Sequence, residues 1–271
     1  MKDIRDKIFR TISERMITAV IIADEEGILS GIAAAEEEAN RIGLKISDTL
    51  DEGCRIQKGK VIIRFAGKPK QIAKAEETVM GHLAKTSGIA TAANLFVQKA
   101  GNRIKIVSGA WKKMPVSIKE SIRMAISTGG ASSRIMEKPF IYLDKNYIRM
   151  IGGIKTCLRT ATGLNGHLRV LQLKGDYQDI DLEACEAAEN GADIIFIDTG
   201  RISDIQKVTA KLNEDGKRSK VVVAFAGGIN LKDIHRLRCM DVDILDVGRA
   251  IVDAPLLDMK LEVEKVDNVT T

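Results

Sequence analysis

Two glycine turns near the C-terminal end of the chain have the composition of a phosphate-binding site. An apolar run at 221–225 is followed by Gly227 and Gly228, and a second run at 243–247 is followed by Gly248 and Arg249. Glycine lets backbone N–H groups approach phosphate oxygens, and a helix that follows such a turn presents its positive end. Arg249 would add a charge-assisted hydrogen bond. The turns therefore predict a phosphate site, and the alternative is that they only close tight connections.

Basic side chains follow several of the other apolar runs. Lys112, Lys145 and Lys174 all stand at or just beyond the ends of expected strands, and Arg134 lies between two of them. Together they could hold a pyrophosphate or an acidic acceptor. The alternative is solvated surface, since the chain has 42 lysines and arginines. A desolvated lysine could also form a Schiff base with a carbonyl compound.

One carboxylate and one aromatic residue complete the candidate site. Asp198 ends the run 194–197, where a carboxylate can hold magnesium or ribose hydroxyls; the alternative is a cap for the next helix. Trp111, the only tryptophan, precedes Lys112 and could stack on a heterocycle or pack in the core. The three histidines have no metal-ligand spacing.

These residues depend on an alternation of strands and helices that occupies the second part of the chain. Short apolar strands that alternate with helices are typical of a parallel sheet covered by helices, either closed into a barrel or open. The expected strands cover 104–107, 140–143, 168–173, 193–197, 221–225 and 242–247. The expected helices cover 116–127, 145–162, 180–190, 202–212 and 231–238. We expect a barrel domain at 101–255, with the candidate residues at the strand ends.

The first part has a different pattern, and we expect a mixed α+β domain at 1–100. The expected elements are a helix at 2–15, a hairpin of 18–22 and 27–32, a helix at 33–41, strands at 44–50 and 61–65, and a helix from Pro69 to about 99. The tail at 256–271 is expected to pack back on this domain.

Composition excludes several classes of protein. Hydrophobic residues make up 45% and charged residues 29% of the 271 residues, as in soluble globular proteins. No apolar run has the length of a membrane span, the charged N-terminus does not indicate a signal peptide, and four scattered cysteines favour a reducing cytoplasm. A net charge of +5 and 4% aromatic residues argue against nucleic-acid binding.

Several segments, in order and spacing, resemble the quinolinate phosphoribosyltransferase family, the type II phosphoribosyltransferases of NAD biosynthesis. The similar segments are Ala75-Glu76-Glu77-Thr78 (A-E-R-T in the family), 87–91 (S-G-I-A-T), 189–198 (A-G-A-D-I-I-x-L-D), 226–230 (S-G-G-I), Val247-Gly248 (V-G) and 254–258 (A-P-A-L-D). The resemblance covers nearly the whole chain. It implies an incomplete α/β barrel of the type II phosphoribosyltransferase kind, and a cytoplasmic homodimer. It also implies a reaction of magnesium-bound phosphoribosyl pyrophosphate with a pyridine dicarboxylate, which loses carbon dioxide to give nicotinate mononucleotide.

The chain departs from the family at the positions that would bind the dicarboxylate. Glu77 replaces an arginine, and the family's R-K-T-T-P reads Trp111-Lys112-Lys113-Met114-Pro115. H-N-H-R keeps only Arg134, and K-D-N-H becomes Asp144-Lys145-Asn146-Tyr147. The strand that carries a glutamate in the family reads Leu171-Gln172-Leu173-Lys174. Each lost charge-assisted hydrogen bond costs about 1.5–3 kcal/mol, so quinolinate is not expected to be the substrate.

Two functional hypotheses follow. The first is a phosphoribosyltransferase-like enzyme that binds a phosphoribosyl donor or a nucleotide and has an altered acceptor pocket. Phosphate would be held by Gly227, Gly228, Gly248 and Arg249. Lys112 and Asp198 would act in catalysis, and Asp198 would bind magnesium or the ribose. Arg134, Lys145, Lys174 and Trp111 would contact the substrate. The second is a non-catalytic homologue that binds a nucleotide or a protein partner as an accessory subunit.

Overall fold

The computed structural model describes residues 3–267, which divide into two units. The first unit contains the residues up to Asn94, the segment Pro115–Gly130 and the residues from Asp253; the second contains Leu95–Met114 and Ala131–Val252. Within 3–267, no helix is both long enough and apolar enough to cross a membrane.

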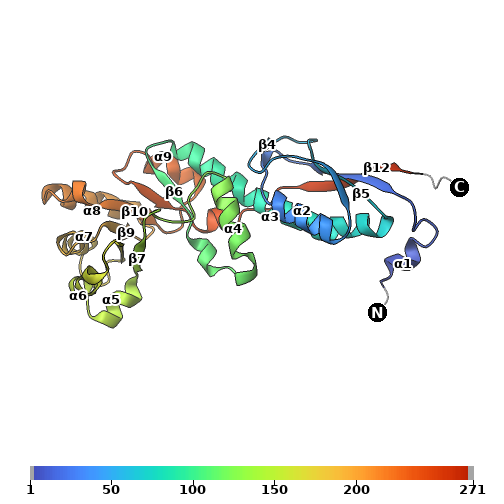
Figure 1. Ribbon diagram of the computed structural model, residues 1–271. Helices are drawn as coiled ribbons and strands as arrows, with labels where there is room; N and C mark the ends of the chain where they lie inside the picture. The colour runs from blue at the N-terminus through green and yellow to red at the C-terminus, as the bar shows by residue number, and fades with distance from the viewer. Residues whose placement is uncertain (1–2, 268–271) are drawn as a thin grey trace. The chain divides into compact units, whose positions relative to one another are not determined.

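The first unit is built on an antiparallel sheet in the order β12-β1-β5-β3 (Figure 1). The strands are β1 (Ile17–Ala23), β3 (Lys45–Thr49), β5 (Val61–Gly67) and β12 (Met259–Val266). Two helices, α2 (Ile32–Arg41) and α3 (Pro69–Ala100), contribute to the same core, in which Phe65, Ile21 and Leu83 are fully buried. The tail of the chain thus returns to the first unit as β12, which pairs with β1 along its whole length.

Two expectations for the first unit are wrong. The hairpin does not form, because both edges of β1 are taken by β5 and β12, and β2 (Gly27–Ile28) pairs instead with β4 (Arg55–Ile56). The helix expected at 2–15, whose first residue lies outside the described range, shrinks to α1 (Arg5–Ile8). The apolar side chains of Ile4 and Ile8 remain exposed, so no packing supports a longer helix.

The boundary between the units also differs from the expected one, because α4 (Val116–Thr128) belongs to the first unit. The end of α4 packs closely on α3: a Cβ on Gly129 would overlap the backbone oxygen of Ala90 and lie 2.6 Å from the Cβ of Ala93. Thr128 also donates a hydrogen bond of 2.9 Å to Glu52. The segment following the first parallel strand therefore returns to the first unit before the second strand begins.

The second unit is a parallel sheet of six strands in the order β6-β11-β10-β9-β8-β7. The strands are β6 (Lys105–Val107), β7 (Phe140–Leu143), β8 (Leu168–Leu173), β9 (Ile194–Ile197), β10 (Val222–Ala226) and β11 (Ile244–Asp246). In the described residues, β6 and β7 lie at opposite edges and do not pair, so the barrel is open. One face of the sheet forms an apolar cluster that includes Val170, Phe196 and Ala224. The prediction of an incomplete α/β barrel is confirmed.

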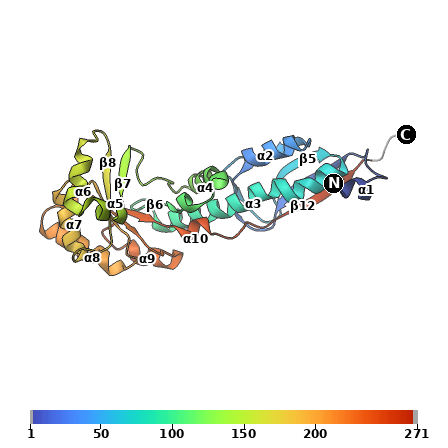
Figure 2. The same ribbon diagram turned by 90° about the horizontal axis from the view of Figure 1, so that it is seen from below.

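Helices cover the other face of this sheet (Figure 2). They include α7 (Ile180–Glu189) and α8 (Ile202–Glu214), which pack on each other. The single helix expected at 145–162 is divided into α5 (Lys145–Ile151) and α6 (Ile154–Thr160), because Gly152 and Gly153 have φ angles of 94° and 112°. The helices after the last two strands are short: α9 is Ile234–Leu237 and α10 is Arg249–Val252.

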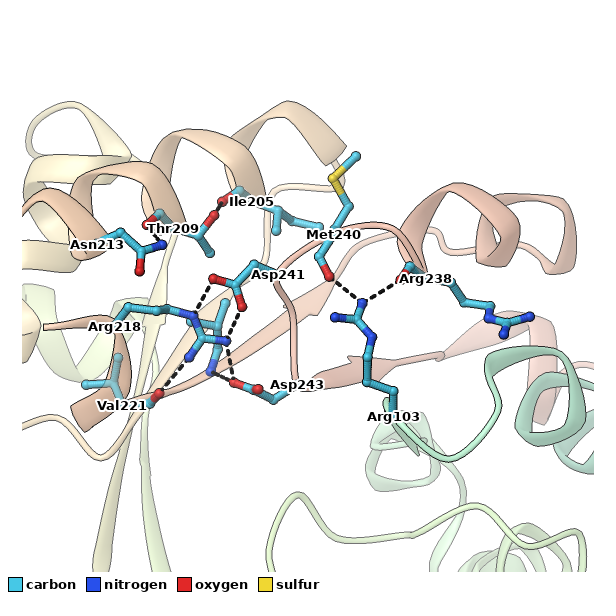
Figure 3. Close-up of polar contacts among 11 residues, drawn as sticks. Arg103, Ile205, Thr209, Asn213, Arg218, Val221, Arg238, Met240, Asp241 and Asp243 are labelled. Atoms are coloured by element: carbon cyan, nitrogen blue, oxygen red, sulfur yellow. Dashed lines mark hydrogen bonds and ion pairs between the residues drawn. The ribbon is translucent and has the colours of Figure 1, made fainter.

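Two arginines hold the N-terminal ends of β10 and β11 in place (Figure 3). Arg218 donates to both carboxylate oxygens of Asp241 at 2.7 and 2.9 Å, to Asp243 at 3.0 Å and to the backbone oxygen of Val221 at 3.0 Å. Arg103 donates to the backbone oxygens of Arg238 and Met240. These contacts hold the two strands in place from the edge opposite to the glycine turns, as is usual for the stabilising face of a barrel.

Candidate active site

Polar residues gather where the parallel strands end. Because all six strands run in one direction, their C-terminal ends meet at one edge of the sheet. Asp144 follows β7, Lys174 follows β8, Asp198 follows β9, Gly227 follows β10, and Asp246 ends β11. The topology therefore brings together most of the residues that the sequence indicated.

Asp198 lies at the centre of a hydrogen-bonded cluster that joins three strands. Its Oδ2 atom lies 2.9 Å from Nζ of Lys174 and accepts a hydrogen bond of 2.6 Å from the amide of Gln172. Lys174 also donates to the backbone oxygen of Asp198 at 2.5 Å, and Gln172 accepts from the backbone N–H of Lys145 at 3.1 Å. Asp198 does not cap α8, whose N-cap is Arg201, so the capping interpretation is wrong.

Asp246 is a second carboxylate at this edge, and the sequence interpretation missed it. Its Oδ1 atom accepts a hydrogen bond of 2.9 Å from the backbone N–H of Gly109. Removal from water raises the pKa of this carboxyl group, and the charge of Asp198 raises it further, whereas Gly109, Lys112 and Lys113 act in the opposite direction. The sequence contains a signal for Asp246, because a carboxylate at the end of an apolar strand is the same pattern that indicated Asp198.

Tyr142 lies beneath these charged groups and was also missed. The Nζ atom of Lys112 lies 5.2 Å from the centroid of its ring, a cation–π contact. The ring meets Phe196 edge to face, with centroids 5.5 Å apart. Burial raises the pKa of the Tyr142 hydroxyl, as do the charges of Asp198 and Asp246. The contacts show that the aromatic floor of the site is continuous with the apolar cluster of the sheet.

The contacts and exposure of four other candidates are as follows. The guanidinium carbon of Arg134 lies 5.7 Å from the ring centroid of Phe140, the first residue of β7. The indole N–H of Trp111 donates to the backbone oxygen of Ser133 at 2.9 Å, which fixes the ring against the segment after α4. The side chains of Lys145 and Arg249 are both on exposed residues.

The glycine turn after β10 packs against the turn after β9. Gly200 donates a hydrogen bond of 3.1 Å to the backbone oxygen of Ala226. A Cβ on Gly227 (φ 115°) would overlap the backbone nitrogen of Gly200, whereas a Cβ on Gly228 (φ 70°) would meet nothing within 4 Å. Gly248 has no positive φ, and a Cβ there would make an ordinary contact of 3.5 Å with Ala110. Close packing thus requires Gly227, while Gly228 faces open space.

This difference gives a prediction for stability. Gly228→Ala is expected to lower the free energy of unfolding by about 1–2 kcal/mol, the cost of a left-handed backbone for a residue with a side chain. Gly227→Ala is expected to cost more, because it adds a collision with the backbone of Gly200. Urea denaturation of the two variants measures the difference. Equal losses of unfolding free energy would show that the turn at Gly227 can move away from Gly200 at no energetic cost.

The residues around Asp198 do not fit a magnesium ion bound to the Oδ2 atom of this carboxylate. Magnesium requires near-octahedral oxygen ligands. The Oδ2 atom of Asp198 is already bonded to an ammonium group and an amide, and an ion there would lie against the positive charge of Lys174. Among residues 3–267, no group of three or more acidic, histidine or cysteine side chains has an arrangement that could hold a metal.

Comparisons with known proteins agree with this architecture in both units. The family model for the quinolinate phosphoribosyl transferase C-terminal domain matches residues 89–262, and that for the N-terminal domain matches residues 5–87. A probable carboxylating nicotinate-nucleotide pyrophosphorylase from Archaeoglobus fulgidus is 28% identical over 251 residues, which cover 91% of this chain and 94% of that protein. The human nicotinate-nucleotide pyrophosphorylase is 25% identical over 248 residues, covering 90% of this chain and 81% of that protein.

Solved structures show the same fold. The nicotinate-nucleotide pyrophosphorylase from Francisella tularensis superposes with a TM-score of 0.82 at 23% identity, covering 97% of this chain and 91% of that one. The enzyme from Pyrococcus furiosus gives a TM-score of 0.83 at 22% identity, covering 97% of this chain and 73% of that one. With both domain models matched in order along one chain, the protein belongs to the quinolinate phosphoribosyltransferase family.

Proposed function

We propose that this protein binds a phosphoribosyl donor or a nucleotide at the C-terminal edge of its parallel sheet, and that its acceptor is not quinolinate. The observation that carries the proposal is the cluster of Asp198, Lys174 and Gln172 beside the exposed turn at Gly227 and Gly228. A glycine turn that faces open space suits phosphate oxygens, and a neighbouring carboxylate suits ribose hydroxyls.

The chain's own residues would act mainly by positioning charge. The backbone of Gly227, Gly228 and Gly248 would hold the 5′-phosphate, and Arg249 would contact it from α10. Lys112 would face the pyrophosphate, which leaves C1′ of the ribose with the bonding electron pair as an acceptor nitrogen bonds to C1′. Asp198, whose negative charge is balanced by Lys174, would hold the ribose hydroxyls. Such catalysis works through preorganised electrostatics and needs no covalent intermediate.

The acceptor is where this chain is expected to differ from its relatives. A pyridine dicarboxylate requires several cationic donors in fixed positions. Glu77 carries the opposite charge, and Arg134 contacts the ring of Phe140. Arg134, Lys145 and Trp111 are the groups proposed to contact the acceptor. A less acidic acceptor fits this set better than quinolinate does.

A non-catalytic role is the second candidate, and one observation favours it. Gln172 lies on the strand that carries a glutamate in the family, and its amide donates a hydrogen bond to Asp198, so this position supplies no second carboxylate. A homologue that only binds a nucleotide, or a protein partner, would tolerate this change. The cytoplasmic location and the homodimer implied by the family resemblance belong to the proposal as well, and light scattering tests the dimer.

Ligand-dependent thermal unfolding tests the proposed function. Phosphoribosyl pyrophosphate and nicotinate mononucleotide are each expected to stabilise the protein, by about 2.7 kcal/mol when a ligand is present at about 100 times its dissociation constant. Quinolinate is expected to give no shift. Lys112→Met is expected to weaken the effect, whereas Lys155→Met, a matched change of an exposed lysine on α6, is not.

The outcomes separate the two candidates. Stabilisation by the donor together with product formation from a panel of acceptors supports the enzyme. Stabilisation by nucleotide without turnover of any acceptor favours the binding protein. If no phosphate ligand shifts the unfolding temperature, the phosphate site itself is wrong.

A further inference from the structure

We propose that Lys174 takes the place of a divalent cation at Asp198, so that this site binds its phosphoribosyl ligand without a metal ion on that carboxylate. The inference rests on the proposed function and concerns the same site. It makes Lys174 a residue that contacts the ligand, and Gln172 a residue that positions Asp198.

The ammonium group of Lys174 is held in a defined place. It lies 2.9 Å from Oδ2 of Asp198 and 2.5 Å from the backbone oxygen of the same residue. An ammonium group has three N–H donors, so these two contacts leave one for a ligand oxygen. The side chain of Lys174 is 31% exposed and that of Asp198 is 26% exposed, so a ligand can reach both. The pair thus presents a positive donor at the point where a metal would otherwise neutralise the carboxylate.

Gln172 excludes the arrangement that a metal needs. A backbone N–H can only donate, so the contact of 3.1 Å from Lys145 identifies the oxygen of the Gln172 amide. The amide nitrogen then points to Asp198, to which it donates at 2.6 Å. A glutamate at this position would put two carboxylates in contact, an arrangement that requires a proton or a cation between them. With glutamine, the Asp198 charge is satisfied by the protein alone.

The second carboxylate of the site does not restore a metal position. Asp246 uses one oxygen to accept the N–H of Gly109, and burial disfavours its charged form. A divalent ion bound to Oδ2 of Asp198 would also have to displace the Lys174 ammonium, which lies 2.9 Å from that atom. The charge balance therefore favours a ligand oxygen, not a metal ion, next to Asp198.

The test compares binding of phosphoribosyl pyrophosphate to the full-length protein in EDTA and in excess magnesium, by calorimetry. The wild-type affinity is expected to change less than about threefold between the two conditions. Lys174→Met is expected to weaken binding about tenfold or more in both, the loss of one charge-assisted hydrogen bond. Lys155→Met is the matched control and is expected to bind as the wild type does.

The double variant Gln172→Glu/Lys174→Met is expected to create the missing metal site. It should bind Mn²⁺, measured by paramagnetic resonance, at concentrations at which the wild type does not. It should also bind phosphoribosyl pyrophosphate at least tenfold more tightly with magnesium than with EDTA. Its melting curve and circular dichroism show whether it is folded. If it is not, Mn²⁺ binding is measured on the single variant Gln172→Glu instead.

Each result has one meaning. Wild-type binding that is abolished by EDTA and restored by magnesium overturns the inference and leaves the proposed function intact. If phosphoribosyl pyrophosphate binds in neither condition, the donor-binding part of the proposed function fails, and Mn²⁺ binding still decides the role of Lys174. Equal Mn²⁺ binding by the wild type and the double variant shows that Lys174 does not exclude a cation.

Discussion

Replacing Gly88 by alanine is expected to lower the free energy of unfolding of the first unit by about 3 kcal/mol, near the upper end for overpacked sites. Gly88 lies inside α3, and a Cβ there would overlap the backbone oxygen of Pro255 and lie 3.2 Å from the backbone nitrogen of Leu257. Backbone atoms cannot rotate away as a side chain can. Moving this segment would also break the hydrogen bond of 3.0 Å from Leu257 to the backbone oxygen of Ala84.

Gly81→Ala is the matched control, because Gly81 lies in the same helix with open space around its would-be Cβ. Alanine is a better helix former than glycine, so this change is expected to raise the free energy of unfolding by about 0.5–1 kcal/mol. The two substitutions should therefore act in opposite directions. Urea denaturation followed by circular dichroism measures both, while the fluorescence of Trp111 reports on the second unit. Similar shifts for the two variants would contradict the close packing of α3 on the segment after Ala254.

Local sequence patterns predicted those elements whose ends are marked by residue types typical of such positions. The long helix α3 begins at Pro69 and ends before Gly101, and both residues suit those positions. The six parallel strands were found because each is short, apolar and followed by a helix. The hairpin was wrong because strand pairing is not local: Ile17 pairs with Gly67 on one side and with Val266 on the other. No pattern within 17–32 contains that information.

The candidate site was predictable as far as topology determines it. Lys174 and Asp198 follow neighbouring parallel strands, so their proximity follows from the fold alone. The partners within the site were not predictable, because Gln172 and Asp246 are ordinary strand residues until their side chains are placed. The contact of Arg134 with the ring of Phe140 was not predictable either, because the segment before β7 has no regular structure that would indicate its direction.

Asp246→Asn is expected to remove a pH dependence of stability that the wild type has. Burial raises the pKa of Asp246 in the folded protein above its value of 3.8 in the unfolded chain. Between these two pKa values the folded state binds more protons, so the wild type loses stability as the pH rises, by up to about 1.4 kcal/mol per pH unit. Asparagine keeps an oxygen that can accept the N–H of Gly109 but carries no charge to desolvate.

The variant should therefore be more stable than the wild type at neutral pH, and its advantage should shrink as the pH falls toward 4. The difference between the two proteins is the quantity to measure, by urea denaturation at a series of pH values, since all other titrating groups are shared. Asp243→Asn is a contrasting change directly before β11, where Arg218 donates a hydrogen bond of 3.0 Å to the carboxylate. Removing that charge is expected to destabilise the protein at neutral pH. A stability difference for Asp246→Asn that stays constant with pH would show that the carboxylate titrates normally, and that water or a cation reaches it.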